Sequence, residues 1–183
     1  MMELLGNLLI APPSVKNNFW HKTVIMITED HAQGSIGVVL NKRSSISIAE
    51  LGERLGLFIN HPGVVYIGGP LCPKNISIIH SNEWITKNTL CINDYFSLSS
   101  SDDMLPRISA GDVPKQWRLF AGISIWDAGQ LYNEIKGIKP YNHSTSWCIA
   151  SGDTDLVYSY DGKEQWLKSL EKSGNEFTKN ILK

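Results

Sequence analysis

The sequence predicts an α+β fold, and three observations support this. Short runs of β-branched and apolar residues, typical of strands, recur along the chain. Amphipathic helical patterns lie among them, but without the regular strand–helix alternation of a doubly wound parallel sheet. The chain has 183 residues, 42% hydrophobic and 19% charged, which is an ordinary balance for a globular protein. No repeat, charge block or linker divides it, so we expect a single domain over residues 1–183.

Strands are expected wherever apolar and β-branched residues gather between turn signals. In the first half of the chain these runs are 8–11, 23–28, 36–40, 64–67 and 76–79. The polar stretch 29–34 between the second and third runs predicts a hairpin with a loop longer than two residues. In the second half, 117–120 and 123–125 predict one strand bent at Gly122, and 156–160 predicts a last strand.

Helices are expected at four places. Ser47 with Glu50 three residues later is a capping box, which predicts a helix over 48–55 that ends at Gly56. Residues 101–105 open a second helix with Pro106 in its first turn, and 128–136 forms a third. The turn Asp161-Gly162 leads into a closing helix that carries Trp166.

Charge and targeting signals exclude several classes of protein. Lys+Arg is 17 and Asp+Glu is 18, a formal net charge of -1, so a nucleic-acid partner held by bulk charge is not expected. The first residues lack a basic region followed by an apolar run, and no apolar stretch approaches bilayer length. Three widely separated cysteines fit reduced thiols better than a disulfide framework. We therefore expect a cytoplasmic protein that does not bind membranes.

Common catalytic motifs are absent from the sequence: it has no G-x-S-x-G, H-E-x-x-H, Walker A or G-x-G-x-x-G pattern, so no cofactor and no metal site is predicted. Gly68-Gly69-Pro70 is either an anion-binding loop or a tight turn that ends a strand. Cys72 is a candidate nucleophile and His80 a candidate acid–base group, whereas Cys91 and Cys148 stand in apolar contexts typical of a core.

Several short motifs follow one another in order along the chain. They are Gly6-Asn7-Leu8-Leu9-Ile10-Ala11-Pro12-Pro13, the stretch 34–42, Gly68-Gly69-Pro70-Leu71, His80, Trp126 with Gly129-Gln130-Leu131 and Glu134-Ile135, and then Trp147, Asp153, Leu156 and Trp166. This set spans nearly the whole chain and resembles the YqgE/AlgH family of bacterial proteins. The element around Trp126 is its most specific part.

The resemblance implies a mixed, partly barrel-like β-sheet system flanked by helices, in a cytosolic protein. It implies no established reaction and no agreed catalytic residues. Members of the family often carry the label of transcriptional regulator. This sequence shows neither a helix-turn-helix pattern nor a basic face, so we interpret that label as indirect.

The leading hypothesis is a non-enzymatic regulatory or binding protein, whose motif-bearing turns build a cleft for a small molecule or a protein partner. Its candidate residues supply hydrogen-bonding amides, an aromatic wall, an imidazole and close backbone approach: Asn41, Gly68, Gly69, His80, Trp126 and Gln130. A purely structural role at sheet corners is the alternative for the same residues. A hydrolase or thiol-dependent enzyme that uses His80 is the second hypothesis, and a DNA-binding regulator is the third.

Overall fold

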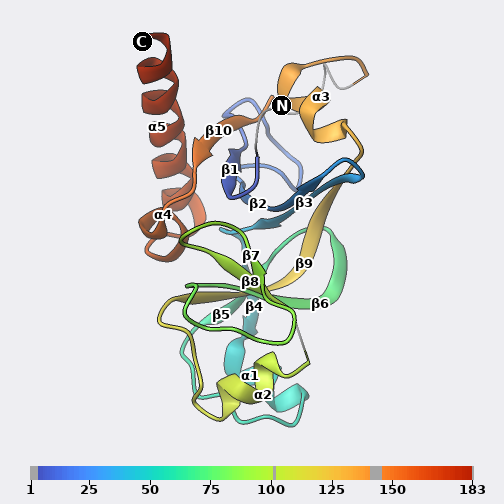
Figure 1. Ribbon diagram of the computed structural model, residues 1–183, viewed down its shortest axis with the longest axis vertical. Helices are drawn as coiled ribbons and strands as arrows, with labels where there is room; N and C mark the ends of the chain where they lie inside the picture. The colour runs from blue at the N-terminus through green and yellow to red at the C-terminus, as the bar shows by residue number, and fades with distance from the viewer. Residues whose placement is uncertain (1–3, 101, 141–145, 183) are drawn as a thin grey trace.

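The computed structural model describes residues 4–100, 102–140 and 146–182, and in these ranges the chain forms a ten-stranded sheet and five helices (Figure 1). The sheet has two halves that share one long strand, β9 (Trp117–Asp127). The fold is thus α+β, as the sequence predicts. Among the described helices, none is both long enough and apolar enough to cross a bilayer.

The first half of the sheet is antiparallel throughout, in the order β10-β1-β2-β3-β9. Its strands besides β9 are β1 (Asn7–Ile10), β2 (Val24–His31), β3 (Gly34–Val39) and β10 (Cys148–Ser151). β2 and β3 form the expected hairpin, with an irregular register between Ile27 and Glu29. The last strand of the chain therefore pairs with the first.

The second half is mixed. It contains β4 (Arg43–Ser47), β5 (Val64–Ile67), β6 (Leu71–His80), β7 (Leu90–Cys91) and β8 (Ser97–Ser99). β6 pairs antiparallel with β9 on one side and β8 on the other, whereas β5 runs parallel to β9. The sheet curls into a half-barrel, in agreement with the partly barrel-like system that the resemblance implies. A positive φ of 85° at Gly122 lets β9 continue through both halves as one bent strand.

The apolar strands are buried on both faces, which explains why their sequences are continuously apolar. In β2, Val24 and Met26 pack with the closing helix, while Ile25 and Ile27 face the opposite side together with Trp126. The helices are α1 (Ile48–Arg54), α2 (Met104–Ser109), α3 (Gln130–Lys136), α4 (Thr154–Tyr158) and α5 (Gly162–Ile181). Figure 1 shows α5 beside β10, and α1 and α2 at the far end of the second half.

Two expectations from the sequence are wrong. The segment predicted as a strand over 156–160 forms no strand: its first three residues belong to α4, which Asp153 caps by accepting a 2.9 Å hydrogen bond from the Leu156 N–H. Cys91 is exposed rather than in the core. The Ser47 cap of α1 is confirmed, as is Pro106 in the first turn of α2; Ser101, at the expected start of α2, lies outside the described residues.

Candidate functional site

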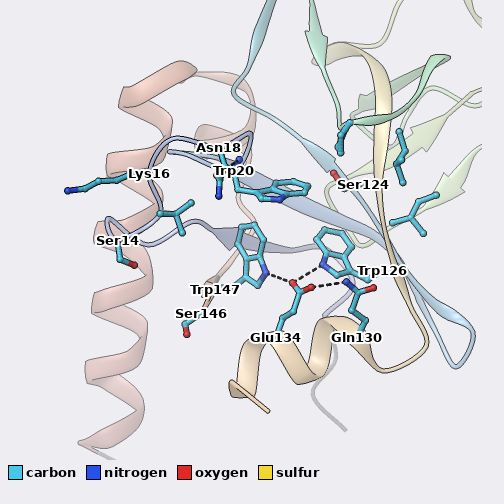
Figure 2. A pocket seen from close by; sticks show the side chains of 14 residues that line it. Ser14, Lys16, Asn18, Trp20, Ser124, Trp126, Gln130, Glu134, Ser146 and Trp147 are labelled. Atoms are coloured by element: carbon cyan, nitrogen blue, oxygen red, sulfur yellow. Dashed lines mark hydrogen bonds between the residues drawn. The ribbon is translucent and has the colours of Figure 1, made fainter. Parts of the chain in front are cut away.

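A cavity of about 590 Å³ opens where five segments that are distant in the sequence meet (Figure 2). They are the loop between β1 and β2, the start of β6, the end of β9, helix α3 and the residues just before β10. A volume of this size is typical of small-molecule sites. We call this cavity the tryptophan pocket, after Trp20, Trp126 and Trp147 in its wall.

Glu134 on α3 lies at the centre of the hydrogen bonds in the tryptophan pocket and is only 8% exposed. Its Oε2 accepts from the indole nitrogens of Trp126 at 3.1 Å and Trp147 at 2.9 Å. Its Oε1 accepts from Nε2 of Gln130 at 2.8 Å (Figure 2). All three donors are electrically neutral. Across the described residues, no lysine, arginine or histidine forms an ion pair with this carboxylate.

Gln130 is oriented by a second hydrogen bond. Its Oε1 accepts from the backbone N–H of Asp127 at 3.0 Å, so its amide nitrogen must face Glu134. The two residues are one helical turn apart, which places them on the same face of α3. The short helix thus presents an amide and a carboxylate together to the end of β9.

The three indole rings pack against one another. Trp20 stacks on Trp126, with 6.4 Å between ring centroids and 30° between planes. Trp147 meets both edge-on, with its ring centroid 5.8 Å from that of Trp20 and 6.4 Å from that of Trp126. Trp20 is the most exposed of the three, so it forms the part of the wall that reaches solvent.

Ser124 on β9 lines the tryptophan pocket and is only 1% exposed. Its hydroxyl has no hydrogen-bond partner among the residues that the structure describes. A buried hydroxyl without a partner costs about 1–3 kcal/mol, so such groups are uncommon in folded proteins. The pocket therefore combines a buried carboxylate, an unpaired hydroxyl and aromatic faces. No group of three or more His, Cys, Asp or Glu side chains in the described ranges is arranged to hold a metal ion.

Of the six candidate residues, Trp126 and Gln130 lie together in the tryptophan pocket. Asn41 does not line it. Its side chain accepts from the Val24 N–H at 2.9 Å and donates to the carbonyls of Lys22 and Gly162, each at 2.8 Å. These bonds join the start of β2 to the start of α5.

Gly68 and Gly69 follow β5, which lies parallel to β9, and they lie beside the bend of β9 at Gly122. A Cβ atom on Gly68 would overlap the carbonyl oxygen of Gly122, and one on Gly69 would overlap the backbone of Ile123. The Gly68 carbonyl accepts from the Val39 N–H at 2.7 Å, and its own N–H donates to the Ala121 carbonyl at 2.8 Å. The next residues, Pro70 and Leu71, do line the pocket.

His80 is fully buried at the far end of β6. Its Nδ1 lies 2.9 Å from the carbonyl oxygen of Ser81, and its Nε2 lies 2.8 Å from the hydroxyl of Ser99. Burial lowers the pKa of His80 below the ordinary value of 6.5, and the hydrogen bond to Ser81 and the charge of Glu83 oppose this only in part.

Sequence reasoning did not single out Trp20, Ser124, Glu134 and Trp147 as site residues. One signal for Glu134 was available, since an acidic residue four positions after Gln130 shares its helix face. Ser124 also had a signal, since it lies two positions before Trp126 in the same strand and therefore on the same face of it.

A mixed sheet with a tryptophan-walled pocket at one end of its shared strand thus defines an α+β protein with a cavity of about 590 Å³. The chain belongs to the AlgH-like family, whose model matches residues 8–178. A UPF0301 protein of Parabacteroides distasonis is 30% identical over 97% of this chain and 86% of its own. Another from Shewanella denitrificans is 29% identical over 95% of this chain and 93% of its own.

Two solved structures share the fold. The solution structure of the AlgH protein from Pseudomonas aeruginosa superposes with a TM-score of 0.77 at 26% identity, over 93% of this chain and 89% of that one. A crystal structure of a Corynebacterium diphtheriae protein gives a TM-score of 0.68 at 21% identity, over 91% and 85% of the two chains.

Proposed function

We propose that this protein is a non-enzymatic, regulatory binding protein of the bacterial cytosol whose tryptophan pocket takes a small molecule. One observation carries the proposal: Ser124, whose buried hydroxyl has no partner among the described residues, lines a cavity of about 590 Å³. A ligand that reached this hydroxyl would supply the missing hydrogen bond, so binding would relieve a cost that the empty protein carries. The flanking indoles supply apolar contact area for the rest of the molecule.

Two other buried serines show why the position of Ser124 matters. Ser77 and Ser169 also have hydroxyls without partners among the described residues, but neither lines the tryptophan pocket. Ser77 is 2% exposed, close to the 1% of Ser124. Ser77→Ala is therefore a matched control for Ser124→Ala.

The test is a thermal-shift screen of the purified protein against nucleotides, metabolites and divalent metals. A ligand at about 100 times its dissociation constant adds roughly 2.7 kcal/mol of stability, which shifts the melting temperature measurably. A hit should weaken in Ser124→Ala and persist in Ser77→Ala. A screen with no hit, or hits that neither variant changes, would contradict the proposal.

The enzymatic alternative has less support. His80 has a serine hydroxyl at hydrogen-bond distance, as a nucleophile–base pair would, but His80 and Ser99 are each 0% exposed. The thiol version needs Cys72 near His80. Leu71 and His80 pair with residues six positions apart on β9, which separates the two ends of β6 by roughly 20 Å.

A further inference from the structure

We infer that the tryptophan pocket recognises a small organic ammonium compound, whose positive charge pairs with Glu134 and lies against the indole wall. The inference rests on the proposed function and names the class of ligand. Its central observation is a buried carboxylate whose hydrogen bonds are nearly complete but whose charge is unpaired.

The described partners of Glu134 are all hydrogen-bond donors, and such donors stabilise the carboxylate form. Indole N–H groups can only donate, and the Gln130 amide nitrogen is fixed toward Glu134 by the Asp127 N–H. Three donors require both carboxyl oxygens to accept.

One acceptor position on the carboxylate stays open. An ionised carboxylate offers about four acceptor positions, two on each oxygen. Oε2 of Glu134 uses two, for Trp126 and Trp147, whereas Oε1 uses one, for Gln130. The remaining position on Oε1 suits an N–H donor from a ligand, because Glu134 lines the cavity.

The protein itself does not neutralise this charge. Lys16 is the only cationic side chain in the described pocket lining, and it is exposed. Figure 2 shows its ammonium end directed away from the three tryptophans. The carboxylate of Glu134 would therefore repel an anionic ligand, whereas it would attract an ammonium group.

The indole wall favours the same ligand. A cation over an aromatic face is attracted by the negative potential of the ring, and tryptophan is the strongest such partner. Trp126 and Trp147 each donate a hydrogen bond to a carboxylate, and this donation raises the electron density of the rings. The partly open Trp20 extends this surface toward solvent.

Three probes of matched shape test the inference: phenethylamine, phenethyl alcohol and phenylacetate. Each is titrated into nitrogen-15-labelled protein, and the indole N–H signals of Trp126 and Trp147 are followed by NMR. We expect the amine to bind at least about tenfold more tightly than the alcohol, since charge-assisted hydrogen bonds exceed neutral ones by this margin. Phenylacetate should bind most weakly.

Glu134→Gln should reduce the preference for the amine to about threefold or less, while keeping an oxygen that accepts from the indoles. Glu164→Gln is the matched control, because it removes the same charge from an exposed position in the first turn of α5. Should Glu134→Gln fail to fold, Trp20→Leu serves instead. This substitution keeps an apolar wall but removes one aromatic face. It should therefore weaken binding of the amine more than binding of the alcohol.

The outcomes separate this inference from the proposed function. Equal binding of amine and alcohol, tightest binding of phenylacetate, or an amine preference that survives Glu134→Gln would overturn the ammonium inference and leave a binding pocket. No response of the indole signals to any of the three probes would also overturn it. The proposed function is tested separately, by the wider thermal-shift screen and by the effect of Ser124→Ala on its hits.

Discussion

The hydroxyl of Ser99 lies 2.8 Å from Nε2 of His80, and neither side chain reaches solvent. Burial lowers the pKa of His80 below 6.5, so the ring is neutral near pH 7. Because the carbonyl of Ser81 can only accept, Nδ1 carries the proton and Nε2 accepts from the Ser99 hydroxyl. A second bond of 2.7 Å joins Ser99 to Thr89. His80 is thus a neutral imidazole that joins the end of β6 to β8.

Stability should fall in acid because of His80. Burial lowers the pKa of the folded His80 below 6.5, so the unfolded chain binds more protons in mildly acidic solution. The contribution is complete above pH 6.5 and is lost as pH falls through the lower folded pKa. We expect the free energy of unfolding, measured with urea, to decrease with a steeper slope in the wild type than in His80→Gln.

His61 also contributes to the acid dependence of stability that this experiment measures. Burial lowers its pKa as well, so it adds a slope of the same sign. His61→Gln should therefore remove part of the acid dependence, and the double variant should remove more than either single one. Parallel curves for the wild type and His80→Gln would contradict the assignment to His80.

Glu134→Ala should destabilise the protein by about 3 kcal/mol or more. The substitution leaves the indole nitrogens of Trp126 and Trp147 buried without their acceptor, at about 1–3 kcal/mol for each unsatisfied donor. Urea unfolding followed by tryptophan fluorescence measures this. Glu164→Ala, at an exposed position, should stay within about 0.5 kcal/mol of the wild type, and an equal loss in both variants would argue against the network.

Ser124→Ala should raise stability by about 1 kcal/mol, because it removes a buried hydroxyl without a described partner. Ser99→Ala should do the opposite, by a similar amount, since its hydroxyl bonds to His80 and Thr89. The melting temperatures of the two variants, measured under identical conditions, test whether the two substitutions change stability in opposite directions. A clear loss of stability in Ser124→Ala would mean that its hydroxyl already has a partner.

Gly69→Ala should cost about 3 kcal/mol or more, because the new methyl group would overlap the backbone of Ile123 and push β5 away from β9. Gly174→Ala is the matched control. No atom lies within 4 Å of a Cβ at Gly174, so alanine should stabilise α5 by about 0.5–1 kcal/mol. Chemical denaturation of both variants measures the difference, and similar values would contradict the close approach of the Gly69 and Ile123 backbones.

Local sequence patterns predicted the well-packed elements. The apolar runs that became β1, β2 and β3 are long enough to show their character, and the Ser47 cap marks α1. Short or polar strands escaped detection, among them β4 with the sequence RSSIS and β7 with two residues. These segments are strands because they pair with strands elsewhere in the chain, and a short stretch of sequence does not show its pairing partner. That the chain forms one domain stays a prediction.

The pocket was predicted only in part for the same reason. Trp126 and Gln130 are neighbours along the chain and belong to one recognisable motif. Trp20 reaches them from more than a hundred positions away, in the loop between β1 and β2, and no local pattern shows that contact. The helix α4 was missed because its Leu-Val-Tyr core has strand propensity, which the Asp153 cap overrides.

The shared strand β9 also dictates when this chain can fold during synthesis. Neither half of the sheet is complete before β9, residues Trp117–Asp127, has left the ribosome, and β1 gains its second neighbour only with β10 near the C-terminus. Pairings of such long sequence separation form slowly. The nascent chain therefore carries unpaired edges on β3 and β6 until β9 has been made, an interval in which such edges are open to aggregation.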